Sequence, residues 1–201
     1  EIMKASRFVL YCSMAFLAMV SCNKPDKNAF AIDGELENGR VANKAYLYSF
    51  LEEYDKLKFV DSTNVISGEF HFNGVCGAPR EAFIKFDDGF SFSFILSPDT
   101  LRAQVGQNGY CVTGTPENER LSKLVMKQMN TINEKAALQA EYNKLRSDSV
   151  LTKTLEDSIV GRFRGVSAEF WKDVEAAMAD TANPLLASQA RRLFSRYLPK
   201  E

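Results

Sequence analysis

Histidine and tryptophan occur once each in the 201 residues, and the four cysteines include no Cys-X-X-Cys pair. The only histidine, His71, cannot build a multi-histidine site, and thiol redox catalysis normally uses two closely spaced cysteines. Glycine-rich phosphate loops, Gly-X-Ser-X-Gly and His-Glu-X-X-His are also missing. The sequence therefore predicts a non-enzymatic protein with no catalytic residues, no cofactor and no metal site.

An excess of charge of either sign is missing too, because 25 Lys and Arg residues balance 26 Asp and Glu residues. No basic patch predicts nucleic-acid binding. The acidic stretches Asp87-Asp88-Gly89 and Glu52-Glu53, with Asp55 nearby, lack the alternating spacing of a calcium loop. They are interpreted as a solvated turn and a loop between strands.

The first 21 residues have the organisation of a signal peptide. Lys4 and Arg7 form a short positive region, and residues 8–20 form an apolar run that ends at a small residue, Ser21. A spanning helix needs about 20 apolar residues, so this run is too short to cross a bilayer. It is typical of a secretory signal that is cleaved from the mature chain.

Residues 17–22, Leu-Ala-Met-Val-Ser-Cys, resemble a bacterial lipobox. The resemblance implies cleavage after Ser21 and a diacylglycerol thioether on Cys22, with an acylated amino terminus, since stable anchoring takes more than one lipid chain. The alternative is an ordinary signal peptide with a chance cysteine. With the anchor, residues 22–28 are a lipidated tether, and the protein belongs to the cell envelope, on the outer membrane and facing the periplasm.

Residues 29–115 alternate apolar and polar side chains with the period of a strand. Phe30 and Ile32 begin the pattern, Tyr46, Tyr48 and Phe50 continue it, and Phe70 and Phe72 flank His71. Ser67-Gly68 and Asp88-Gly89 are predicted turns between strands. Short strands separated by turn residues predict an antiparallel β-sandwich or barrel-like domain. Under this alternation His71 points to solvent.

Residues 116–201 change to the period of a helix. Pro116 suits a first helical position, apolar residues then recur every three or four positions, and Ser147-Asp148-Ser149 interrupts them. A second apolar stripe runs from Leu151 to Met178, and Asn183-Pro184 predicts the start of a third helix. The fold class is therefore α+β, in which a helical hairpin and a short third helix follow the β domain. In the hairpin we expect contacts between two sets of residues: Leu121, Val125 and Ile132 with Phe163, Phe170 and Val174.

Two further sets of residues are candidates for chemistry or binding. Cys76 and Cys111 remain after the signal and the lipid site are set aside, and they are either a disulfide or two separate thiols. Aromatic side chains at Tyr46, Tyr48, Phe90, Phe92 and Phe94 form either a binding face or part of the sandwich core. As a face, the phenylalanines suit a hydrophobic peptide and the tyrosines suit stacking on a sugar ring.

The β-rich half resembles the domain of unknown function 4369, a family found at the N-termini of exported lipoproteins. The resemblance rests on several short pieces in the same order. They are Ile32-Asp33-Gly34, Ala45-Tyr46-Leu47-Tyr48, Val60-Asp61-Ser62, residues 67–74, residues 92–105 and Val112-Thr113-Gly114-Thr115. In this family the domain often precedes helices and a thioredoxin-like domain that carries Cys-X-X-Cys, and residues 182–198 resemble the segment before such a domain.

Three functions follow as expectations. The first is a lipid-anchored, non-enzymatic binding or assembly module of the cell envelope, with an envelope protein or peptide as partner. The second, which the family resemblance implies, is the N-terminal regulatory part of a thiol-disulfide oxidoreductase whose thioredoxin-like domain is missing from these residues. The third is a glycan-binding lipoprotein. The sequence predicts no oligomeric state.

Overall fold

The computed structural model of the protein describes residues 26–37, 39–51, 56–107 and 109–195. The predicted signal peptide, Cys22, and the acidic loop residues Glu52, Glu53 and Asp55 lie outside the described residues. Within these ranges, no helix combines the length and the apolar character needed to cross a bilayer.

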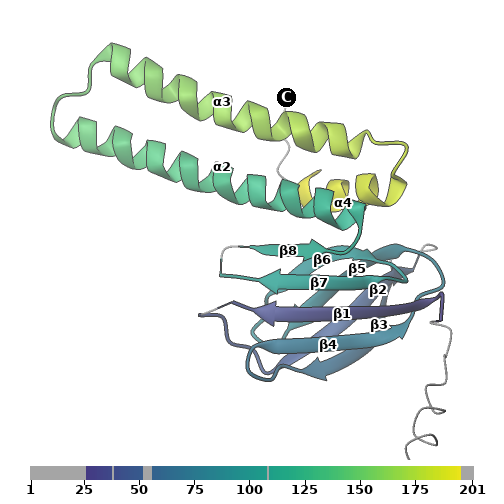
Figure 1. Ribbon diagram of the computed structural model, residues 1–201. Helices are drawn as coiled ribbons and strands as arrows, with labels where there is room; N and C mark the ends of the chain where they lie inside the picture. Colours follow the sequence, from purple (N-terminus) through teal and green to yellow (C-terminus); the bar gives the residue numbers. More distant parts are fainter. Residues whose placement is uncertain (1–25, 38, 52–55, 108, 196–201) are drawn as a thin grey trace, which may run out of the picture.

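In the described residues, eight strands form two four-stranded sheets that pack as a sandwich, not as a closed barrel (Figure 1). One sheet, which we call sheet A, has the order β4-β1-β7-β8, and the other, sheet B, has the order β3-β2-β5-β6. The strands are β1 (Ala29–Leu36), β2 (Lys44–Leu51), β3 (Lys56–Asn64), β4 (Glu69–Val75), β5 (Arg80–Phe86), β6 (Ser91–Leu96), β7 (Thr100–Val105) and β8 (Tyr110–Thr113). The predicted sandwich is confirmed.

One strand pair departs from the antiparallel expectation. β1 lies between β4, its antiparallel neighbour, and β7, to which it is parallel. The predicted turn at Ser67-Gly68 is present, with positive φ at both residues, but it carries the chain from sheet B to sheet A. The strands on either side of this turn therefore do not pair as a hairpin. The Asp88-Gly89 turn does join a paired hairpin, β5 with β6.

The core lies between the two sheets and is rich in phenylalanine because alternate residues of every strand point inward. Phe70 packs edge-on against Phe72 and Phe86, with ring centroids 6.3 and 5.3 Å away. Gly34 makes this packing possible, since a Cβ at that position would overlap the Phe70 ring. Other core side chains are Phe30, Ile32, Leu47, Ile84, Phe92, Phe94, Leu101 and Val112.

Three helices follow the sandwich in the described part of the chain: α2 (Pro116–Ser147), α3 (Lys153–Met178) and α4 (Pro184–Phe194). Each begins and ends close to its predicted position. The side chain of Thr115 caps α2 by accepting from the Asn118 N–H at 3.3 Å, and Thr152 caps α3 in the same way. α2 and α3 fold back on each other as an antiparallel hairpin, and α4 packs beside their sandwich end (Figure 1).

Helix α2 covers one open edge of each sheet with polar side chains. The Asn118 amide accepts from the Ile95 N–H and donates to the Ile95 carbonyl, both at 2.8 Å, at the edge strand β6. One turn later the Ser122 hydroxyl accepts from the Val112 N–H at 2.7 Å and donates to its carbonyl at 2.9 Å, at the edge strand β8. Both side chains are buried. They complete the backbone hydrogen bonding of the two edges where the helix packs on them.

The predicted hairpin contacts are correct only near the sandwich. Val125, Phe170 and Val174 belong to the main core, whereas Leu121 packs in a second cluster with Ile95 and Leu186. Ile132 is 50% exposed, so its predicted burial is wrong. Phe163 is half-buried, with the Lys135 ammonium 4.4 Å from its ring centre. The reason is geometric, because the hairpin extends past both sheets and α4, where only two helices remain to cover the stripe (Figure 1).

Replacing Gly161 or Gly165 with alanine is expected to stabilise the fold by about 1 kcal/mol per site, since alanine is the better helix former. Both glycines lie inside α3, and a Cβ at either position would meet no heavy atom within 4 Å apart from the nearby backbone of its own helix. Urea unfolding of the two variants measures the effect. Gly34→Ala is the matched control and should destabilise the protein because its Cβ overlaps Phe70. Destabilisation by Gly161→Ala would contradict the prediction.

Candidate functional site

The outward side of sheet B carries a cluster of half-buried and exposed aromatic side chains. Along β2, Ala45, Leu47 and Ser49 are buried inside the sandwich, so strand alternation turns the intervening aromatic residues outward. β3 and β5 pair with β2 on either side, and their register places Phe59 and Phe83 opposite Tyr48. We call the resulting set the aromatic face: Tyr46, Tyr48, Phe50, Phe59 and Phe83.

The rings of the aromatic face stand against one another across three strands. Tyr48 stacks on Phe83 with centroids 5.0 Å apart and an interplanar angle of 10°, and it meets Phe59 edge-on at 5.7 Å. Phe50 lies 5.8 Å from Phe83. Phe59 and its neighbour Leu57 are each 54% exposed. The stacked ring faces contact one another within the cluster. The groups that a partner can contact are therefore mainly ring edges and aliphatic carbon.

Cationic side chains border this face. Lys85 is exposed and lies opposite Tyr46 in the strand register, and the Lys44 ammonium is 5.5 Å from the centre of the Tyr46 ring. From α4, the Arg192 guanidinium lies 3.9 Å from the centre of Phe50, and its Nε donates to Glu81 at 2.7 Å. Glu81 is buried and paired, so it offers no exposed negative charge. The border therefore favours partners that carry carboxylates.

The phenylalanines considered for the binding face belong to the interior. Phe92 and Phe94 are buried between the sheets, which makes them core residues. Phe90 is half-buried, stacks on Phe86 at 6.4 Å and is covered by the Arg40 guanidinium at 3.8 Å. A binding role for Phe92 and Phe94 is therefore wrong, Phe90 is covered by Arg40, and Tyr46 and Tyr48 face outward. The inward face of β6 has the same alternating pattern as an exposed face.

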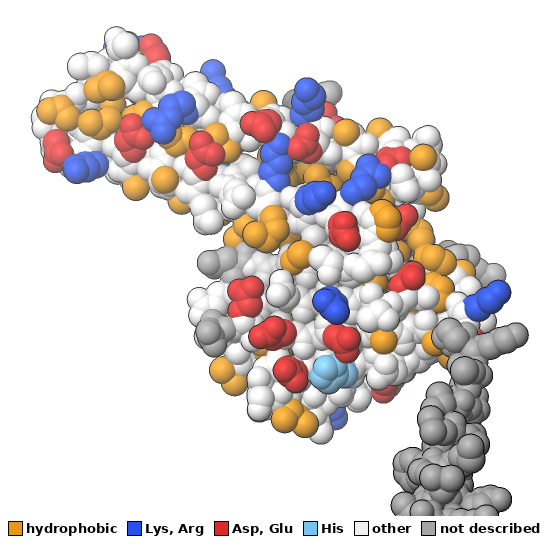
Figure 2. Space-filling view, viewed as in Figure 1, with side chains coloured by type: hydrophobic (Ala, Val, Ile, Leu, Met, Phe, Trp, Pro, Cys, Tyr) orange, Lys and Arg blue, Asp and Glu red, His pale blue; other side chains and the backbone are white. Residues whose placement is uncertain are grey.

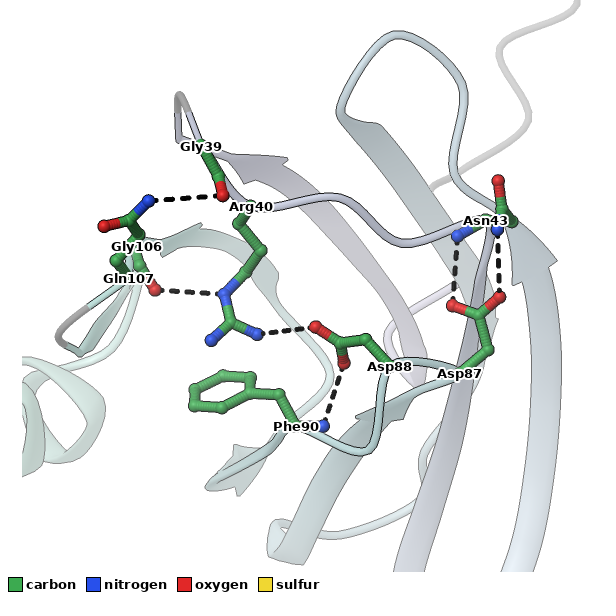
Figure 3. Close-up of polar contacts among 8 residues, drawn as sticks. All are labelled: Gly39, Arg40, Asn43, Asp87, Asp88, Phe90, Gly106 and Gln107. Atoms are coloured by element: carbon green, nitrogen blue, oxygen red, sulfur yellow. Dashed lines mark hydrogen bonds and ion pairs between the residues drawn. The ribbon is translucent and has the colours of Figure 1, made fainter.

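Arg40 bridges three loops at one end of the sandwich through its side-chain contacts (Figure 3). Its guanidinium donates to the Gly106 carbonyl at 3.1 Å and to Asp88 at 3.0 Å, and it covers Phe90. Asp87 accepts from the backbone N–H and the amide of Asn43, and the backbone donor holds the pKa of Asp87 below its usual value. Both carboxylates are thus bonded to protein donors, as expected for a structural turn.

The two remaining cysteines are free thiols, so the disulfide alternative is wrong. Cys76 is buried beside the end of β4, and its thiol donates to the Ala78 carbonyl at 2.9 Å. Cys111 lies on β8, at the opposite edge of the same sheet. Three strand spacings separate these edges by about 14 Å, and a disulfide requires Cα atoms within about 7 Å.

His71 points outward, as predicted, and does not assemble a reactive group. Its Nδ1 lies 3.0 Å from Asp33, and its Nε2 lies 3.9 Å from Glu69, on the exposed surface of sheet A. Across the described ranges, no group of three or more His, Cys, Asp or Glu side chains is arranged to hold a metal ion.

Burial raises the pKa of Tyr110, so its hydroxyl stays protonated.

Sequence reasoning missed Phe59, Phe83 and Arg192. Phe83 and Phe59 were inside predicted strand segments, but only the pairing of β2 with both neighbours brings them to Tyr48. Arg192 comes from α4, more than 100 positions away from Glu81. The signal in the sequence was the alternating aromatic run of β2. Knowledge of which residues on the neighbouring strands lie opposite this run would have added Phe59 and Phe83 to the face.

Sequence comparison gives one match and one negative result. A search of curated proteins found no similar sequence. A family model matches residues 30–121, which hold β1 apart from Ala29, the strands β2 to β8 and the first residues of α2, including Asn118 but not Ser122. Residues 30–121 match the family described as Domain of unknown function (DUF4369), which confirms the resemblance predicted for the β-rich half.

Proposed function

We propose that this protein is a lipid-anchored, non-enzymatic binding module of the cell envelope that holds a polypeptide partner on its aromatic face. The anchor is Cys22, and the domain faces the periplasm from the outer membrane. The observation that carries the binding role is the outward-facing aromatic row in which exposed Phe59 packs on half-buried Tyr48 and Tyr48 stacks on half-buried Phe83. Exposed clusters of large apolar side chains commonly mark interaction sites.

Three of the four edge strands, β6, β8 and β3, favour binding through the face of the sheet instead of strand addition. α2 occupies the β6 and β8 edges at Ile95 and Val112. The third edge, β3, has a register irregularity opposite Leu47 and Tyr48 and carries the exposed Lys58. Bulges and lysines protect natural edge strands from pairing with other chains. The aromatic face lies next to this protected edge.

A polypeptide suits this face better than a glycan. Sugar rings bind by lying on the open face of an aromatic ring, but one face of Tyr48 stacks on Phe83, and the Tyr48 ring also packs edge-to-face with Phe59. A polypeptide partner with apolar side chains can pack against ring edges, as in the core of a protein interface. Exposed carboxylates on the partner would then meet Lys85 and Lys44 at the border. Neither free thiol supports the oxidoreductase alternative, since they lie at opposite edges of sheet A.

Photo-crosslinking in cells tests the proposed face. Phe59 is replaced with p-benzoylphenylalanine, and the matched control carries the same group at Ile66, which is 70% exposed and lies outside the face. We expect a discrete adduct with one protein from position 59, and its loss when Lys85 is changed to Glu. The absence of any adduct at position 59, or the same adducts from both positions, would overturn the proposal.

A further inference from the structure

A hollow lies on the side of the molecule opposite the aromatic face, between the β7–β8 connection and the part of α2 that extends past the sheets. It has a volume of about 510 Å³, and we call it the methionine groove. Its lining includes Gly109, Cys111, Met126, Met129, Asn130 and Asn133. Met126 is 46% exposed. A Cβ on Gly109 would lie 3.4 Å from the Met129 side chain, which is ordinary contact distance, so the connection lies against the helix here.

The groove continues onto the outer surface of sheet A. A neighbouring hollow of about 480 Å³ shares Gln104 and Cys111 with it and extends to Asp33, Glu69 and His71. The two hollows form one trough, with sheet A as its floor and α2 as its wall. In Figure 2 acidic side chains gather over this sheet, below a hydrophobic group at the foot of the helices.

The charge along the trough is mainly negative. Asp33, Glu35, Glu37 and Glu69 line it, against a single guanidinium from Arg102. Asp33 and Glu69 lie beside His71. The Glu35 and Glu37 carboxylates have no hydrogen-bond or ion-pair partner among the described residues. Anionic lipids and nucleic acids would be repelled, whereas a cationic ligand gains attraction at each free carboxylate.

We propose that this trough is a second binding site, separate from the aromatic face, for an extended peptide segment in which basic and aliphatic residues alternate. Methionine side chains are flexible and polarisable, so they accept apolar side chains of different shapes. Lysine or arginine side chains of the segment then reach Glu35 and Glu37. The floor from β8 to β4 spans about 14 Å, which accommodates about four or five extended residues.

Calorimetric titration of the purified full chain with acetyl-Lys-Leu-Lys-Leu-Lys-amide tests this site. We expect saturable binding that is about tenfold tighter than that of the peptide with Glu in place of Lys, because charge complementarity sets specificity. The double variant Glu35→Gln/Glu37→Gln should weaken binding about fivefold, and added salt should weaken it further. Met126→Gln should also weaken it, since the apolar wall is lost.

Two control variants separate the trough from other surfaces. Glu134→Gln removes an exposed carboxylate from α2 outside both hollows, and Phe59→Ser alters only the aromatic face. Binding of the lysine peptide should be unchanged in both. Equal binding of the two peptides, no detectable binding, or full affinity in the Glu35→Gln/Glu37→Gln variant would overturn the proposal. Loss of binding in Phe59→Ser would place the peptide on the aromatic face and overturn it as well.

Discussion

Replacing Asn118 with leucine is expected to lower the free energy of unfolding by about 2–5 kcal/mol, because each buried polar group left without a partner costs about 1–3 kcal/mol. Asn118 is fully buried, and its amide bonds both the N–H and the carbonyl of Ile95 at 2.8 Å. Leucine keeps the number and branching of the side-chain heavy atoms, so the loss reports mainly on hydrogen bonding. Chemical denaturation of the two proteins, followed by circular dichroism, measures the difference.

The matched control is Asn143→Leu on the same helix. Asn143 is exposed, and its side chain accepts only from Gln139, at 3.1 Å. Its replacement should change the free energy of unfolding by less than about 0.5 kcal/mol. If Asn118→Leu were as stable as this control, the backbone N–H and carbonyl of Ile95 would not need the α2 side chain as a partner, which would contradict the prediction. Ser122→Ala should also lower the free energy of unfolding, because the backbone N–H and carbonyl of Val112 both lose their hydrogen bond to the Ser122 hydroxyl.

Replacing Cys22 with serine is expected to move the exported protein from the membrane fraction to the soluble fraction. The thioether and the later acylation both require the cysteine, and several lipid chains are needed for stable attachment. Fractionation after a high-salt wash, together with incorporation of labelled fatty acid, measures the change. Cys12→Ser, which alters a cysteine inside the predicted signal peptide, is the control and should leave the attachment intact. A Cys22→Ser protein that stays membrane-bound would show that the lipobox interpretation is wrong.

The elements of this fold could be predicted from sequence because each carries a local pattern. Alternation marked the strands, and Pro116, the Ser147-Asp148-Ser149 break and Asn183-Pro184 marked the helix limits. The pairing of the strands could not be predicted in the same way. β1 and β7 are about 70 residues apart, and nothing local distinguishes their parallel pairing from an antiparallel one. The turn at Ser67-Gly68 likewise has hairpin chemistry but joins strands of different sheets.

The candidate site shows the same limit. Tyr46 and Tyr48 were identified because they share one side of a single strand, whereas Phe59 and Phe83 reach them only through inter-strand register. Phe92 and Phe94 alternate like an exposed stripe and are buried, since periodicity does not say which side of a sheet meets the core. Ile132 continues a regular helical stripe, but the sandwich and α4 end before it. Periodicity predicts which residues share a side, and only the assembled fold decides which side is covered.

Asn118 and Ser122 follow all the strands of the described residues in chain order, and this order affects how the protein folds as it is made. Until α2 begins to fold, the Ile95 and Val112 edges present free backbone donors and acceptors, and free edges recruit strands from other chains. The long-range pairing of β1 with β7 delays closure of the sandwich further. We expect the arrival of the first two turns of α2 to end the period in which neighbouring copies can exchange or add strands at these edges.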